Sequence, residues 1–208
     1  MPWIILGIII SYLVGSIPTA YVFGRVIRGI DIRKFGSGNV GATNALRVLG
    51  RGPGILVLIL DILKGILPTV FLADFVILKL PSVSSELLRI FFGFGCICGH
   101  NWTVFLRFKG GKGVAASLGV LLGLAVRMEG VKWLLVLAIL AWLVTFLISR
   151  IISLSSVVAA ASLPLFAALL KQSGILLFFS LVIAVFAIFR HKANLKRILK
   201  NEEPRFKF

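Results

Sequence analysis

Three polar segments hold the residues that could do chemistry in this chain, and the first covers residues 36–47. It reads GSGNVGATNALR and interleaves hydroxyl, amide and guanidinium side chains with glycines. Glycines allow consecutive backbone N–H groups to point into one concavity, and the N-terminus of a following helix adds a positive dipole. The segment therefore predicts an anion site, with a tight turn as the alternative. Its candidate ligands are Ser37, Gly38, Asn39, Gly41, Thr43, Asn44 and Arg47.

The same segment contains the pattern G-x-G-x-x-G, and Asp61 lies twenty residues after Gly41. A dinucleotide site needs that pattern between a strand and a helix, with the acidic residue near the ribose. No strand is expected before residue 36, and Asp61 falls within an apolar segment. We therefore reject the dinucleotide interpretation.

The second segment, residues 99–115, reads GHNWTVFLRFKGGKGVA and places two lysines around two glycines directly before an expected helix. This arrangement predicts a second cradle for a phosphate. It is not a Walker loop, which would need glycine at Leu106 and serine or threonine at Gly113. A basic cluster that only sets membrane topology is the alternative, and for His100 a structural or a catalytic role is also open. The candidate ligands are His100, Lys109, Gly110, Gly111, Lys112 and Gly113.

The third segment is the tail, which reads RHKANLKRILKNEE over residues 190–203. His191, Asn194 and Arg197 follow one another at three-residue spacing, so a helix would place them along one polar edge. A basic amphipathic helix that lies on anionic lipid is the alternative. No spacing of cysteine, histidine or carboxylate residues indicates a metal site, and we expect no metal and no cofactor.

The composition decides what must position these segments. Hydrophobic residues make up 59% of the 208 residues, charged residues only 14%, and the mean hydropathy is +1.07. A water-soluble globule of this length has too little interior for so many apolar side chains, and a disordered chain or a coiled coil is excluded as well. The apolar segments are long and do not alternate, which argues against a barrel. The expected fold is an all-α integral membrane protein with a single domain over residues 1–208.

About seven transmembrane helices are expected in a bundle. Their ranges are 2–23, 54–78, 87–106, 114–126, 133–149, 151–170 and 174–189, with the fourth short enough to be re-entrant. The net charge of +16 is concentrated in the odd-numbered connections and the tail. The positive-inside rule then places the N-terminus outside and the C-terminus in the cytoplasm.

Small and charged residues inside the expected spans predict how the helices pack. Gly15, Gly99 and Gly119 belong to rows of small residues at four-residue spacing, which allow close approach of helices. Asp61 and Lys64 lie one turn apart in the second span, where isolated charges are costly. We expect them to face the bundle and to pair with each other or with the first connection, and a proton-relay role is the alternative.

Together, the three segments resemble the PlsY family, the bacterial acyl-phosphate:glycerol-3-phosphate acyltransferases. The resemblance extends over the whole chain in length and hydropathy, and the three motifs occur in the same order on the face assigned to the cytoplasm. Two positions depart from the family pattern, because Thr103 stands where proline is common and Asn201 where glycine is common. These departures concern the shape of the loops and remove no expected ligand.

The resemblance implies transfer of a fatty acyl group from acyl phosphate to the 1-position hydroxyl of glycerol 3-phosphate, which forms lysophosphatidic acid and phosphate. It implies a multi-pass protein of the bacterial inner membrane with a cytoplasmic active site. The expected partners are the two substrates and the bilayer, with no nucleic acid, and we expect a monomer. A transporter or channel for a small organic anion is the competing class, although the spans offer little polar lining.

The expected roles follow from the chemistry of two phosphate substrates. Ser37, Arg47 and residues 109–113 are expected to bind glycerol 3-phosphate, and residues 39–44 to hold the acyl phosphate. His191, Asn194 and Ser37 are the expected catalytic residues, with Arg197 as a further ligand. No nucleophile for an acyl-enzyme stands out, so direct attack by the glycerol hydroxyl is favoured. Either His191 or a phosphate oxygen of the substrate is the expected base.

Overall fold

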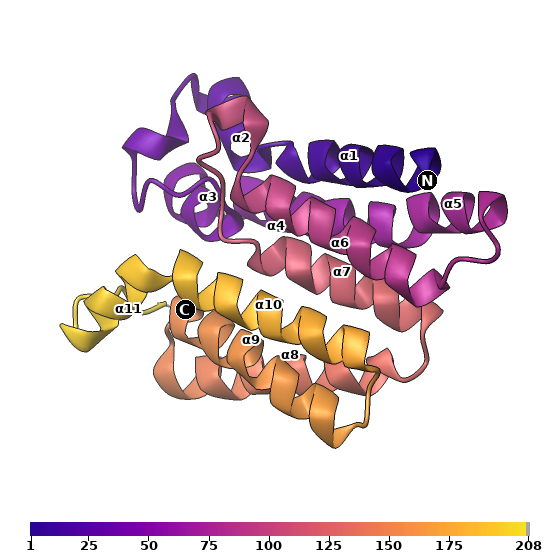
Figure 1. The fold of residues 1–208 in the computed structure, drawn as a ribbon. Helices are drawn as coiled ribbons and strands as arrows, with labels where there is room; N and C mark the ends of the chain where they lie inside the picture. The colour runs from indigo at the N-terminus through magenta and orange to yellow at the C-terminus, as the bar shows by residue number, and fades with distance from the viewer. Residues whose placement is uncertain (207–208) are drawn as a thin grey trace. The chain divides into compact units, whose positions relative to one another are not determined.

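A computed structural model describes residues 1–206, and all regular secondary structure in that range is helical (Figure 1). The chain divides into two compact units, Met1–Arg127 and Met128–Phe208. Each unit is described by itself below. An all-helical architecture is as expected, whereas a single domain over the whole chain stays a prediction.

The first unit carries both glycine-rich segments. Its helices are α1 (Pro2–Ser16), α2 (Thr19–Arg28), η1 (Ile32–Lys34), α3 (Ala42–Leu49), α4 (Arg51–Leu67), η2 (Pro68–Leu72), α5 (Ala73–Lys79), α6 (Ser85–Asn101), η3 (Val104–Leu106) and α7 (Val114–Arg127). Within it, α1 packs along α6 and α4 packs along α7 (Figure 1). The two glycine-rich segments are the connections that lead into α3 and α7.

The second unit carries the tail. It consists of α8 (Val131–Ser149), α9 (Ile152–Leu169), α10 (Gly174–Arg190) and α11 (Lys192–Leu199). Helix α9 packs against both α8 and α10, and α11 turns away from α10 by 60° (Figure 1). The end of the described chain returns to α8, because the backbone N–H of Phe206 donates to the carbonyl of Arg150 at 2.7 Å.

All seven predicted apolar ranges contain helix, yet fewer of them are long enough to cross a bilayer unaided. Four helical stretches are both long enough and apolar enough to cross a membrane, namely Pro2–Arg28, Arg51–Lys79, Val131–Ser149 and Ile152–Leu169. A fifth membrane-crossing stretch is present if the bent pair of α10 and α11 counts as one span. Helix α7 is apolar but shorter than these stretches. The count of about seven spans and the orientation of the termini therefore stay predictions.

The first predicted span, residues 2–23, is not one straight helix. Helix α1 ends at Ser16 and α2 begins at Thr19, with Ile17 in an extended conformation at ψ 113°. The residue before a proline is pushed out of the helical region, and Pro18 has no N–H to donate. The carbonyl of Ile17 accepts from the backbone N–H of Thr19 at 3.0 Å and also from a side chain of α4, as described below.

The rows of small residues allow backbones to touch, as predicted. A Cβ atom added at Gly15 would lie 2.1 Å from the carbonyl oxygen of Cys96, and one at Gly99 would lie 2.1 Å from that of Tyr12. At Gly119, a Cβ atom would lie 2.0 Å from the carbonyl oxygen of Ile62. Helix pairs α1–α6 and α4–α7 are therefore closer than any side chain at these positions would permit.

Replacing Gly119 by alanine should lower the free energy of unfolding by about 1–3 kcal/mol, because α7 must move away from the backbone of α4. The matched control is Gly52→Ala on α4, where an added Cβ atom meets nothing within 4 Å. Helix propensity makes that change neutral or stabilising by at most about 1 kcal/mol. Thermal unfolding in detergent compares the two variants, and equal midpoints for both would contradict the packing argument.

Candidate active site

The loop before α3 is shaped by one buried amide side chain. Asn44 is only 1% exposed, and its Oδ1 accepts a hydrogen bond from the backbone N–H of Ser37 at 2.8 Å. Its Nδ2 donates to the carbonyls of Phe35 at 3.1 Å and of Ile32 at 3.3 Å. Both functional atoms of this predicted ligand are therefore engaged within the chain, and we assign Asn44 to shaping the loop. A contact with substrate stays a prediction.

The other predicted ligands of this loop are more accessible. Ser37 and Arg47 are exposed, whereas Gly38, Asn39 and Thr43 are half-buried and Gly41 is buried at the start of α3. Gly38 has a φ of +71°, in the left-handed region that favours glycine. Ser37 thus lies exposed in a loop that Asn44 holds from α3, and Arg47 lies exposed in the last turn of α3.

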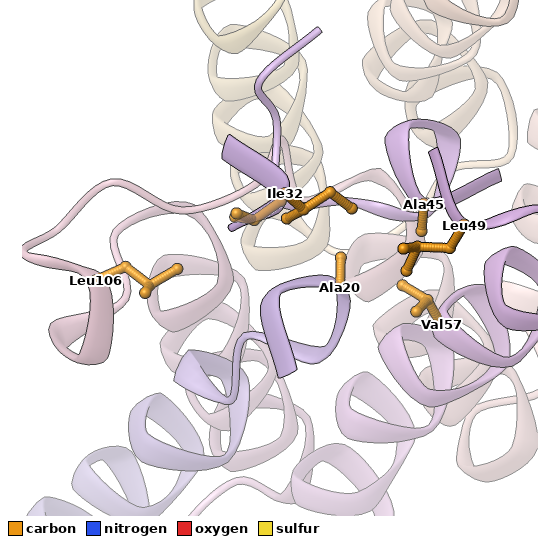
Figure 2. Packing of buried hydrophobic residues seen from close by; sticks show 7 residues of the cluster. Ala20, Ile32, Ala45, Leu49, Val57 and Leu106 are labelled. Carbon is orange, nitrogen blue, oxygen red and sulfur yellow. The ribbon is translucent and has the colours of Figure 1, made fainter. Parts of the chain in front are cut away.

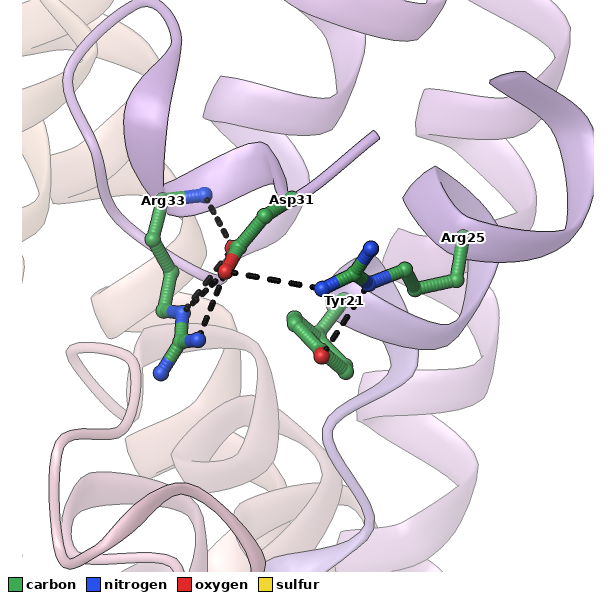
Figure 3. A network of polar contacts seen from close by, with 4 residues as sticks. All are labelled: Tyr21, Arg25, Asp31 and Arg33. Atoms are coloured by element: carbon green, nitrogen blue, oxygen red, sulfur yellow. Dashed lines mark hydrogen bonds and ion pairs between the residues drawn. The ribbon is translucent and has the colours of Figure 1, made fainter. Parts of the chain in front are cut away.

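An ionic network fixes the chain that leads into this loop (Figure 3). Asp31 accepts from the backbone N–H of Arg33 at 3.1 Å and from its guanidinium at 2.6–3.2 Å, and Arg25 lies 3.9 Å from the same carboxylate. The side-chain hydrogen bond from Arg33 is the main reason that the pKa of Asp31 is lowered to about 2. Arg25 and Arg33 also lie over the ring of Tyr21.

A small hydrophobic cluster joins the first glycine-rich segment to the second (Figure 2). Ile32 and Ala45 come from the first connection, Ala20 from α2 and Val57 from α4, and all four have no exposed surface. Leu106 of η3 belongs to the same cluster. The two predicted phosphate segments are therefore anchored on one core inside the first unit.

The second glycine-rich segment folds back onto the end of α6. The backbone N–H of Gly111 donates to the carbonyl of His100 at 2.9 Å, and that of Gly110 donates to the carbonyl of Asn101 at 3.2 Å. Gly113 has a φ of +80° and immediately precedes α7. Lys109 is exposed and Lys112 is half-buried, and Lys112 lies two residues before the start of α7.

The glycines of this segment are required by contact with the chain beneath them. A Cβ atom at Gly110 would lie 2.1 Å from the carbonyl oxygen of His100, and one at Gly111 would lie 2.1 Å from the Nε2 atom of the same residue. At Gly113, a Cβ atom would lie 2.7 Å from Oδ1 of Asn101. The sequence analysis explained these glycines by a phosphate cradle alone, and the close packing is a second reason.

His191 lies at the junction of α10 and α11 in the second unit and is 2% exposed. Its Nδ1 is 2.8 Å from the carbonyl oxygen of Ala187. Because a carbonyl can only accept a hydrogen bond, Nδ1 must carry the proton. A neutral His191 then has its lone pair on Nε2, the form that a general base needs.

Glu203 is a residue of this region that the sequence analysis missed. Its Oε1 accepts from Nδ2 of Asn194 at 2.6 Å and from the hydroxyl of Ser153 at 2.7 Å, and its Oε2 accepts from Nε of Arg197 at 2.7 Å. Two predicted ligands are therefore held by one buried carboxylate. In the sequence, Glu203 could have been recognised as an acidic residue that comes just after a predicted basic helix.

Burial opposes the ionisation of Glu203, but the hydrogen bonds from Asn194, Ser153 and Arg197 outweigh it, and its pKa lies below the usual value of 4.5. Its contribution to stability is therefore present above the pKa of the unfolded state and is lost as the pH falls through the lower folded-state pKa.

Replacing Glu203 by glutamine should lower the thermal midpoint at pH 7, and this deficit should shrink as the pH falls below the folded-state pKa of Glu203. Thermal unfolding in detergent at several pH values checks this trend. The exposed neighbour Glu202 provides the matched control, and Glu202→Gln should have little effect at any pH. A deficit for Glu203→Gln that does not change with pH would contradict the role of its charge.

The structure groups the predicted residues into two sets. Residues 36–47 and 99–113 share a core in the first unit. In the second unit Glu203 holds Asn194 and Arg197 together, and His191 begins the same helix. That both sets serve one site stays a prediction. Within residues 1–206, no group of three or more histidine, cysteine or carboxylate residues is placed to hold a metal ion.

Comparison with known proteins identifies what the chain is similar to. The family described as "Glycerol-3-phosphate acyltransferase" matches residues 5–201. Glycerol-3-phosphate acyltransferases of Desulforamulus reducens and Desulforudis audaxviator are 43% and 42% identical to the chain. The alignments cover 94% of this chain and 92% of the first relative, and 99% of this chain and 96% of the second.

Two solved structures are also similar. Both are crystal structures of PlsY, an integral membrane glycerol 3-phosphate acyltransferase, at 37% sequence identity over 98% of this chain. The glycerol 3-phosphate form has a TM-score of 0.85 with 96% of its chain covered, and the lysophosphatidic acid form has a TM-score of 0.82 with 95% covered.

Proposed function

We propose that this chain, which belongs to the glycerol-3-phosphate acyltransferase family, uses acyl phosphate as its donor and acylates the 1-position hydroxyl of glycerol 3-phosphate. The chain is an integral membrane acyltransferase, in agreement with the sequence analysis. The observation that carries the proposal is a shared core beneath two basic glycine loops, since this reaction brings together two phosphate-bearing substrates.

The two glycine-rich segments offer different groups for binding an anion. Ser37 and Arg47 are exposed on the first, and Lys109 and Lys112 flank the glycines of the second. We assign Ser37, Arg47 and residues 109–113 to glycerol 3-phosphate, and the backbone and side chains of residues 39–44 to the acyl phosphate. Charge-assisted hydrogen bonds contribute about 1.5–3 kcal/mol each, enough to offset the repulsion of two anions held close together.

The reaction needs no covalent enzyme intermediate. The hydroxyl oxygen of glycerol 3-phosphate attacks the carbonyl carbon of the acyl phosphate, and the bond from that carbon to the bridging oxygen breaks. Phosphate leaves with the electron pair, and the hydroxyl proton passes to a base. Two groups are suited to accept it, namely Nε2 of His191 and a phosphate oxygen of the substrate. Correct placement of the two substrates supplies much of the remaining rate.

An anion transporter would use a similar basic surface but would also need a polar path across the membrane. The charged pair within α4 does not supply one, because Asp61 and Lys64 are 2.8 Å apart and bind each other. This contact agrees with the structural pairing that we expected. The transporter hypothesis is therefore set aside in favour of acyl transfer.

We also propose the membrane setting that the charge distribution predicts. The protein lies in the bacterial inner membrane as a monomer with about seven spans, an external N-terminus and a cytoplasmic active site. Labelling of single cysteines, introduced at the N-terminus and in residues 200–206, with a membrane-impermeant reagent on intact cells tests the orientation. Labelling is expected at the N-terminus alone, and the reverse pattern would contradict the proposal.

The proposed reaction is tested with purified protein in detergent or a lipid mesophase. Acyl phosphate and glycerol 3-phosphate together should give equal amounts of phosphate and 1-acyl lysophosphatidic acid, and omission of either substrate should abolish the product. The matched comparison offers an acyl thioester of the same chain length as the donor. Product from the thioester but none from acyl phosphate would contradict the proposed donor, and product acylated at the 2-position would contradict the proposed acceptor hydroxyl.

A further inference from the structure

A buried ionic cluster lies inside the first unit, where α4 meets the break between α1 and α2. Asp61 of α4 is 1% exposed, and its Oδ1 accepts from the hydroxyl of Thr19 at 2.5 Å and from Nζ of Lys64 at 2.8 Å. The ammonium of Lys64 also donates to the carbonyl of Ile17 at 3.2 Å. The cluster therefore ties α4 to the break between α1 and α2.

The same carboxylate faces the chain that carries the glycine loop. Nδ1 of His100, at the end of α6, is 3.9 Å from Oδ1 of Asp61. This distance is too long for a hydrogen bond, but both side chains are buried, so the charge of the carboxylate acts on the imidazole at close range. The second oxygen of Asp61, Oδ2, is buried and accepts no hydrogen bond from residues 1–206.

The opposite side of the His100 ring supports the glycine loop. Nε2 of His100 occupies the space where a side chain at Gly111 would lie, and the carbonyl of His100 accepts from the backbone N–H of the same glycine. One imidazole therefore lies between the buried carboxylate and the loop. A shift of this ring would move Gly111, and the loop carries Lys112 immediately after it.

Stability alone is a weak reason for this cluster. Apolar residues of similar volume often replace a buried ion pair without loss of stability, because burying two charges costs nearly as much as their attraction returns. A fixed charge beside His100 can instead orient its ring, because the electric field of Asp61 and Lys64 favours one arrangement of the imidazole. The cluster is therefore better explained by the placement of the second glycine loop than by the stability of the fold.

We propose that Asp61 is a positioning residue that acts through His100 on residues 110–113 and thereby sets the affinity for glycerol 3-phosphate. The inference rests on the proposed function of that loop. Asp61 does not touch substrate, and its effect passes through the ring of His100. Without the charge of Asp61 the imidazole of His100 is less well fixed, and the loop shifts. Lys112 then binds the phosphate of glycerol 3-phosphate less tightly.

The test is Asp61→Asn, which removes the charge and keeps the shape. We expect the KM for glycerol 3-phosphate to rise about tenfold, while kcat and the KM for acyl phosphate change less than twofold. The matched control is Asp74→Asn in the same unit, because Asp74 also binds two basic side chains, Arg89 and Arg127. Asp74→Asn should leave all three kinetic constants unchanged even where it lowers the thermal midpoint.

A double-mutant cycle with His100→Gln decides whether Asp61 acts through the histidine. If it does, the double variant raises the KM no further than His100→Gln alone. Additive effects, or an unchanged KM in Asp61→Asn, overturn the proposal. If Asp61→Asn does not fold, Thr19→Val removes one hydrogen bond from Asp61, and a rise in the same KM alone is expected. An unchanged KM in Thr19→Val then overturns the proposal as well.

The outcome for Lys112→Gln separates this inference from the proposed function. If Lys112→Gln raises the KM for glycerol 3-phosphate and Asp61→Asn does not, only the positioning role fails. If Lys112→Gln leaves that KM unchanged, the assignment of the loop to glycerol 3-phosphate fails, and the positioning inference is overturned with it.

Discussion

Replacing His191 by alanine should lower kcat by about 10²–10⁴-fold if its imidazole is the general base. The hydrogen bond from Nδ1 to the carbonyl of Ala187 leaves the lone pair of the neutral ring on Nε2, which is the atom able to take the hydroxyl proton. Steady-state turnover at saturating substrates measures the loss. A near-normal kcat would instead identify a phosphate oxygen of the substrate as the base.

A second variant separates base catalysis from a structural role of His191. His191→Asn places an amide donor close to the position of Nδ1 and can keep the hydrogen bond to Ala187, but it has no basic nitrogen. We expect its thermal midpoint to stay near that of the wild type while kcat is as low as in His191→Ala. Recovery of turnover in His191→Asn would show that the hydrogen bond matters rather than the base.

Replacing Lys112 by glutamine should raise the KM for glycerol 3-phosphate by about ten- to a hundredfold. The expected range follows from the loss of one charge-assisted hydrogen bond of about 1.5–3 kcal/mol, because about 1.4 kcal/mol corresponds to a factor of ten in affinity. Lys112 is half-buried and lies two residues before α7 begins at Val114, close in the chain to the positive end of that helix. An anion in this position would interact with both.

Two comparisons make the Lys112 result specific. Lys112→Arg keeps the charge and should recover part of the affinity, and Lys171→Gln makes the same chemical change at an exposed position between α9 and α10. Lys171→Gln should leave both KM values unchanged. A rise in the KM for acyl phosphate alone in Lys112→Gln would show that the two loops hold the opposite phosphates.

The location of the helices was predictable because hydropathy is a local property. Every apolar range contains helix, including the short fourth range and the second range with its charged residues. The break at Ile17 and Pro18 was missed, although the proline itself is visible in the sequence. The helix end at this point depends on the backbone conformation of one residue, Ile17, which hydropathy does not report.

The candidate site was predictable to a different extent in each segment. The sequence singled out Asn44 as a ligand, but only the fold shows both ends of its amide holding the loop. It treated Glu203 as part of a basic tail, but only the fold brings this carboxylate to Asn194 and Arg197. In both cases the function of a polar side chain depends on which distant backbone or side chain it meets.

The sequence by itself determined the membrane character of this protein, its helical class and the three segments that could bind phosphate. Composition, hydropathy runs and glycine spacing carry that information, because each acts over a few residues or over the chain as a whole. The tertiary structure alone decided that Ala45 and Leu106 join two of those segments in one core, and that His100 lies between Asp61 and Gly111. Such contacts arise from packing between residues far apart in the chain, which no local pattern encodes.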